Sequence, residues 1–135
     1  MGKDCSKESW ISFILRMAFV SLFAVASAGK FVGGLNAVAA QFSEMFKGTF
    51  LPLPLVILYA RLIPFLEAII AIWLLMGIRL KEAWIFTAII LISLAFGLVI
   101  GRQNAADNYM YVLIACVGLY FSEFDTCNVG RLIKK

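Results

Sequence analysis

The sequence predicts an all-α integral membrane protein: a four-helix bundle with an amphipathic interfacial helix between its first and second helices. Of the 135 residues, 63% are hydrophobic and 15% are charged, whereas soluble domains average roughly 45–50% apolar and about 25% charged residues. The mean hydropathy of +0.96 agrees with this class. Four stretches approach the roughly 20 apolar residues that a spanning helix needs. They define one membrane domain over residues 1–135, with spans at 10–28, 53–76, 83–100 and 108–124.

The first predicted span, residues 10–28, contains a charged residue, Arg16. Its apolar run ends in small residues at 26–28, a pattern also found in cleaved secretory signals. Arg16 interrupts the run, and Asp4 and Glu8 lie in what would be the basic leader of a signal. These charges favour a retained membrane span over a signal peptide.

Residues 35–47, between the first and second spans, are predicted to form an amphipathic helix at the outer membrane interface. Apolar side chains such as Leu35, Val38 and Phe42 recur at helical spacing, while polar residues occupy the other side. The predicted role is a lid over the bundle. The alternative is a docking surface for a lipid-soluble ligand or a partner subunit.

The second predicted span, residues 53–76, carries a carboxylate near its middle, Glu67. A charge at this depth is costly and normally faces the protein interior with a partner. Arg16 lies about 9 Å inside the boundary marked by Trp10, and Glu67 lies about 14 Å inside the same boundary, marked by Met76. We therefore expect a buried polar pair between Arg16 and Glu67, acting either as a structural tie or as a centre for proton transfer or quinone binding.

Two further groups of residues are candidate binding sites. Tyr59, Arg61 and Trp73 on the second span are candidate contacts for a quinone or a lipid. Lys30, Arg61 and Arg102 are predicted to lie on the outer half, where they form a basic cluster that attracts lipid phosphate or another anion.

The third and fourth spans complete the predicted topology, and the distribution of basic residues orients it. One side carries the larger set of Lys and Arg: Lys3, Lys7, Arg79, Lys81, Arg131, Lys134 and Lys135. The opposite side carries Lys30, Lys47 and Arg102. The positive-inside rule then places both termini in the cytoplasm. Trp10, Trp73 and Trp84 are expected at the cytoplasmic interface, where amphipathic rings are favoured.

Residue usage argues against an intrinsic redox or metal centre. The chain has no histidine, and its cysteines, Cys5, Cys116 and Cys127, form no Cys-x-x-Cys pair. We predict no metal, no intrinsic cofactor beyond a quinone or bound lipid, and no catalytic residue, so the isolated chain is not expected to be an enzyme. The net charge of +4 is spread over helix ends, which excludes a nucleic-acid interface.

Several short motifs resemble those of a known family. They are Arg16 in the first span, Gly29-Lys30 after it, Arg61-Leu62-Ile63-Pro64-Phe65-Leu66-Glu67, and Leu74-Leu75-Met76-Gly77. Together they look like the DoxX and MauE superfamily of small four-helix membrane proteins. The resemblance implies a prokaryotic cytoplasmic (inner) membrane location and points to Arg16, Lys30, Glu67 and Gly77.

The resemblance also implies two kinds of function, both linked to redox enzymes. Some relatives are small membrane subunits of quinone-linked oxidoreductases acting on thiosulfate, and others support maturation of periplasmic redox enzymes. The chain lacks outer-face cysteine pairs, which argues against disulfide or metal delivery. We expect a non-catalytic accessory or anchoring subunit of a larger redox-linked membrane complex, with membrane lipid and other subunits as partners. The alternative is a quinone-reactive subunit of a thiosulfate:quinone type oxidoreductase.

Overall fold

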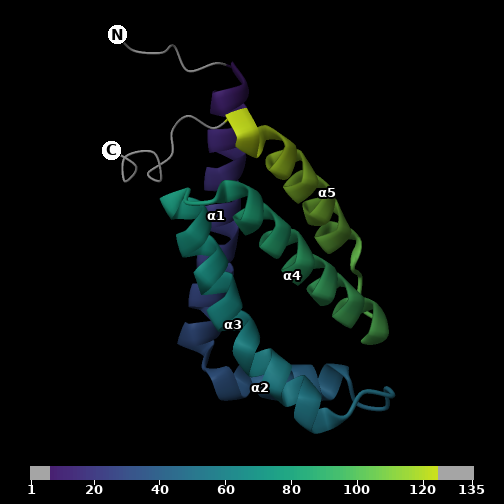
Figure 1. The fold of residues 1–135 in the computed structure, drawn as a ribbon. Helices are drawn as coiled ribbons and strands as arrows, with labels where there is room; N and C mark the ends of the chain where they lie inside the picture. The colour runs from purple at the N-terminus through teal and green to yellow at the C-terminus, as the bar shows by residue number, and fades with distance from the viewer. Residues whose placement is uncertain (1–6, 125–135) are drawn as a thin grey trace.

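The computed structural model describes residues 7–124, and every regular element in this range is a helix (Figure 1). The elements are α1 (Lys7–Gly33), α2 (Leu35–Met45), α3 (Leu53–Met76), α4 (Leu80–Ile100), α5 (Ala106–Phe121) and the 3₁₀ turn η1 (Ser122–Phe124). Within the described range, α1, α3 and α4 are long and apolar enough to cross a membrane. Some residues used in the sequence predictions lie outside the described range: Lys3, Asp4, Cys5, Cys127, Arg131, Lys134 and Lys135.

The helix boundaries follow local backbone chemistry. Helix α1 extends past both ends of the predicted span 10–28 and therefore includes Lys30. Gly34, with φ of 88°, separates α1 from α2. Gly77 ends α3 in the left-handed conformation, with φ of 67°, and its N–H donates to the carbonyl of Trp73 at 3.1 Å. Glycine adopts this conformation without the steric cost that a Cβ atom brings.

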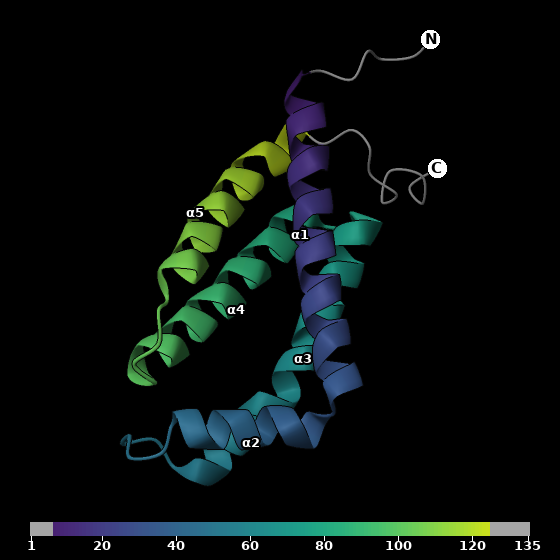
Figure 2. The same cartoon turned by 180° about the vertical axis from the view of Figure 1, so that it is seen from behind.

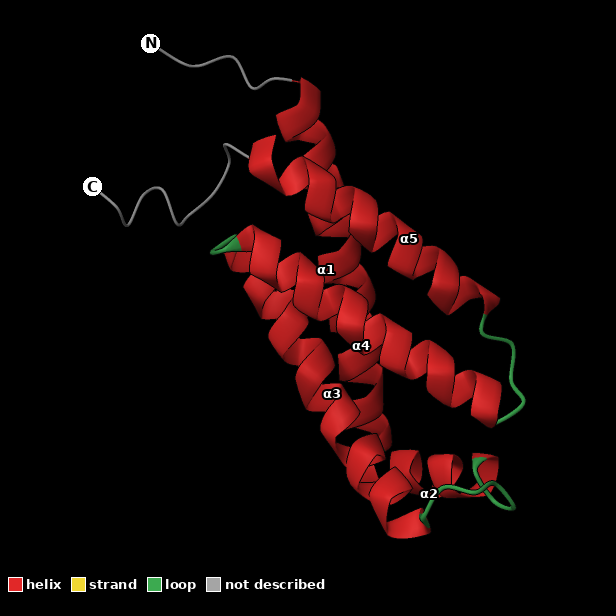
Figure 3. Ribbon diagram, turned by 45° about the vertical axis from the view of Figure 1, so that its right-hand side comes forward, coloured by secondary structure: helices red, strands yellow, loops and turns green. Residues whose placement is uncertain are grey.

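The helices are staggered along their axes. In Figures 1 and 2, the C-terminal end of α3 reaches only the middle of α1, so the first half of α1 extends beyond it. Helix α2 lies across the start of α3, and α4 diverges from α3 after the turn that joins them (Figure 3). Helix α5 then runs back along α4 and reaches the N-terminal half of α1. This stagger decides which polar groups can meet.

The core is centred on Trp84, whose side chain is fully buried. The Trp84 ring packs edge-on against Phe19, with ring centroids 5.1 Å apart. It also covers Gly118 of α5, where an added Cβ would lie 2.6 Å from the ring. The Trp84 ring is therefore not exposed to act as a membrane anchor, because it joins α1, α4 and α5 inside the protein, while its depth at the cytoplasmic interface stays a prediction. Trp10, in contrast, is 56% exposed.

Candidate functional site: a buried ion pair between α1 and α3

Glu67 lies in the middle of the buried face of α3. The buried residues recur at helical spacing, and Ile63 and Ile70 flank Glu67 on this stripe. The side chain of Glu67 is 4% exposed. Because the stripe packs against α1, the carboxylate is directed between the two helices and away from lipid.

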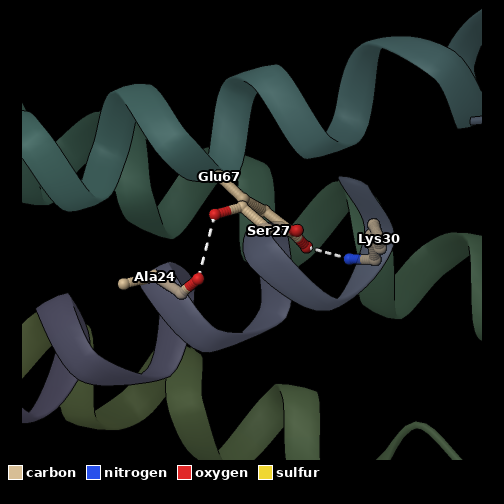
Figure 4. A network of polar contacts seen from close by, with 4 residues as sticks. All are labelled: Ala24, Ser27, Lys30 and Glu67. Atoms are coloured by element: carbon tan, nitrogen blue, oxygen red, sulfur yellow. Dashed lines mark hydrogen bonds and ion pairs between the residues drawn. The ribbon is translucent and has the colours of Figure 1, made fainter. Parts of the chain in front are cut away.

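The partner of Glu67 is Lys30, near the C-terminal end of α1. The Lys30 ammonium donates a hydrogen bond to Glu67 Oε1 and forms an ion pair with it. Figure 4 shows the two side chains pointing toward each other, with Ser27 beside them. The Ser27 hydroxyl donates to the carbonyl of Ala24 at 3.1 Å, within α1 itself. Glu67 Oε2 has no hydrogen-bond partner among the described residues.

The structure thus gives Glu67 a different partner from the predicted Arg16. The depth comparison assumed that Trp10 and Met76 lie at the same level, but the end of α3 lies beside the middle of α1. Glu67 consequently faces the last turns of α1. Arg16 is 4% exposed, and its guanidinium carbon lies 5.4 Å from the ring centroid of Phe13. It belongs to the buried face of the N-terminal half of α1, about 21 Å along the helix from Lys30.

The three candidate quinone or lipid contacts do not share a site. The hydroxyls of Tyr59 and Ser93 bond each other at 2.7 Å beside a cleft between α3 and α4. Arg61 is exposed and lies 3.5 Å from Asn36 of α2. Trp73 donates through Nε1 to the carbonyl of Ile78 at 2.7 Å, so it stabilises the turn at the opposite end of α3. Tyr59 alone of the three lines the cleft.

The three residues of the predicted outer basic cluster also have separate neighbours. Lys30 pairs with Glu67, and Arg61 contacts Asn36. Arg102 lines a different cleft, together with Lys47. Each of the three residues thus has different neighbours in the described structure.

Sequence reasoning missed two residues of these sites, Ser93 and Lys47. Ser93 has no signal in the linear sequence, because its role depends on α4 packing beside Tyr59. Lys47 was identified as basic and outer, but its place in the same cleft as Arg102 required the contact between the end of α2 and the end of α4. Lys30 was detectable: it directly follows the first apolar run, and the motif Gly29-Lys30 contributed to the family resemblance.

The site's chemistry is that of a helix-to-helix tie. An ammonium bonded to a buried carboxylate forms a neutral pair, which lowers the cost of placing either charge in a low-dielectric interior. Within residues 7–124, no group of three or more Cys, Asp or Glu side chains lies together in a way that could hold a metal ion.

Comparison with known proteins identifies the family. No curated protein and no solved structure matches the chain. A family model described as methylamine utilisation protein MauE matches residues 8–111, a range that includes α1 to α4, apart from the first residue of α1, and the start of α5. The match contains both partners of the buried ion pair. The chain therefore belongs to the MauE family.

Proposed function

We propose that this MauE-family protein is a non-catalytic accessory or anchoring subunit of a larger, redox-linked membrane complex. The family description refers to methylamine utilisation, and a system of that kind requires other protein components. The proposal also agrees with the resemblance to DoxX-type proteins, some of which are small membrane subunits of a larger enzyme.

The observation that carries the proposal is the burial of Glu67 and its bond to Lys30. Its carboxylate is buried and bonded to Lys30, between two helices, and neither residue lines the cleft beside Tyr59. A carboxylate held by an ammonium is a poor proton carrier unless that partner is displaced. The strongest polar feature of the described chain thus supports a scaffold more than a reaction centre.

The proposed topology has four spans, with α2 at the outer interface and both termini in the cytoplasm of a prokaryote. Helix α5 is 16 residues long, about 24 Å, and η1 extends it. Arg79 and Lys81 in the turn after α3 supply the positive charge expected of a cytoplasmic loop. In intact cells, a membrane-impermeant maleimide should label Lys47→Cys and leave Lys81→Cys unlabelled. The reverse labelling would refute this orientation.

The functional proposal is tested by native purification. A tagged chain, expressed at its natural level and extracted in mild detergent, should co-isolate with a larger set of subunits that mass spectrometry identifies. Lys30→Met should reduce this co-isolation, whereas Arg61→Met, which removes an exposed cation, should retain it. Isolation of the untruncated chain alone, with no stable partner, would contradict the accessory role.

A second candidate is a quinone-reactive subunit of an oxidoreductase. The observation that favours it is the Tyr59–Ser93 hydroxyl pair beside an otherwise apolar cleft of about 370 Å³ between α3 and α4. This candidate requires substrate-dependent quinone reduction that falls in Tyr59→Phe. Full activity of this variant would exclude it.

A further inference from the structure

Two clefts with opposite chemistry meet at the outer ends of α3 and α4. The first, which we call the apolar cleft, has a volume of about 370 Å³. Its lining comprises Phe46, Leu51, Leu55, Val56, Leu58, Tyr59, Leu62, Ser93, Phe96, Gly97 and Ile100. Among these described residues only Tyr59 and Ser93 carry polar side-chain atoms, and their hydroxyls bond each other at 2.7 Å. Since one of these hydroxyls donates to the other and the remaining side chains are apolar, the cleft wall offers mainly hydrocarbon.

The second cleft, which we call the basic cleft, has a volume of about 530 Å³. Its lining comprises Met45, Lys47, Gly48, Thr49, Phe50, Ile100, Gly101 and Arg102. The described lining thus contains two cations and no acid. Lys47 also lies 3.3 Å from Glu44, but both side chains of that pair are 72% exposed. An exposed pair of this kind is weak, so it leaves the Lys47 ammonium available to an anion.

The two clefts adjoin where the segment at the end of α2 touches the end of α4. A Cβ atom added at Gly101 would lie 2.7 Å from Met45 Cγ, and one added at Gly97 would lie 3.5 Å from the Phe46 ring. These close contacts bring the end of α2 to the end of α4. Ile100 then contributes to the walls of both clefts.

The spacing of the clefts matches an amphiphile that lies along α4. Ser93 and Ile100, the last residue of α4, are seven residues apart, about 10 Å along the helix, and Arg102 follows two residues later. Half the hydrocarbon thickness of a bilayer is about 15 Å. A ligand with its charged group at Arg102 would therefore extend an apolar tail past Ile100 and along the cleft wall toward Ser93.

We propose that the two adjoining clefts together bind one anionic phospholipid, with its phosphate between Lys47 and Arg102 and an acyl chain in the apolar cleft. Two cations without a lining acid favour a headgroup of net negative charge over a zwitterionic one. A neutral quinone would use the apolar cleft but would leave both cations without a role. The proposal is independent of whether the chain is an accessory subunit.

The test is lipid binding to the full-length protein, measured by native mass spectrometry after exchange into a neutral detergent. Dioleoyl phosphatidylglycerol and dioleoyl phosphatidylcholine are compared because they share acyl chains and differ in net charge. The wild-type protein should bind phosphatidylglycerol more tightly by about tenfold or more. The double variant Lys47→Gln/Arg102→Gln should lose this preference, and the control Arg61→Gln, outside both clefts, should retain it.

A second variant examines the apolar cleft. Leu55 lines it and is 57% exposed, so Leu55→Trp should fill the cleft without disturbing the core. This variant should weaken binding of both lipids, while circular dichroism and thermal unfolding stay near those of the wild type.

Three results would overturn the proposal. The first is equal binding of the two lipids to the wild type. The second is a phosphatidylglycerol preference that survives in Lys47→Gln/Arg102→Gln. The third is displacement of the lipid by a competitor. Displacement by ubiquinone would assign the apolar cleft to a quinone. Competition by glycerol phosphate as strong as that of the whole lipid would assign the basic cleft to a free anion.

Discussion

Replacing Lys30 should destabilise the protein more than replacing its partner Glu67. The Glu67 side chain is 4% exposed, whereas the Lys30 side chain is 27% exposed. Lys30→Met leaves a buried carboxylate without its cation, which costs about 3–5 kcal/mol in free energy of unfolding. Glu67→Leu leaves an ammonium three residues from the end of α1, where it can reach the membrane boundary, and costs about 1–3 kcal/mol.

The double variant Lys30→Met/Glu67→Leu separates the interaction free energy of the pair from the cost of removing each charge alone. Replacing both members of a buried ion pair by apolar residues of similar size is often neutral or stabilising. The double variant should therefore be more stable than Lys30→Met alone. The coupling between the two positions should exceed about 0.5 kcal/mol, the usual limit for independent sites.

The assay is a reversible unfolding titration of each variant in mixed micelles, followed by circular dichroism. Arg61→Met is the control, because it removes an exposed cation of α3 and should change the free energy of unfolding by no more than about 0.5 kcal/mol. The reasoning fails if Lys30→Met is no more destabilising than Arg61→Met. It also fails if Glu67→Leu couples to Arg16→Met instead of Lys30→Met.

Two glycine variants test the packing and the turn. Gly118→Ala places a Cβ 2.6 Å from the buried ring of Trp84, so overpacking should cost about 1–3 kcal/mol and lower the thermal unfolding midpoint. Gly29→Ala is its matched control, because no atom lies within 4 Å of the added Cβ, and its midpoint should not fall. Gly77→Ala forces an alanine into a left-handed φ of 67°, which should cost about 1–2 kcal/mol in the same measurement. An unchanged midpoint in Gly118→Ala or Gly77→Ala would contradict the corresponding contact or backbone argument.

Composition and local pattern were sufficient for the class of protein and for several of its elements. An apolar run and its length are properties of neighbouring residues, so the second span 53–76 coincides with α3. A carboxylate in that run had to be buried and partnered, because the alternative exposes a charge to hydrocarbon. The motif ending in Gly77 likewise marks a helix end, where the left-handed backbone favours glycine.

The choice of partner for Glu67, in contrast, depended on packing over the whole length of α1 and α3. One helical turn of axial shift is about 5.4 Å, enough to replace one candidate cation by another, and no short sequence pattern specifies that shift. The stagger of the helices placed Lys30 at Glu67 and left Arg16 in the other half of α1. The shared cleft of Lys47 and Arg102 follows from the same cause, since it requires the segment at the end of α2 to touch the end of α4.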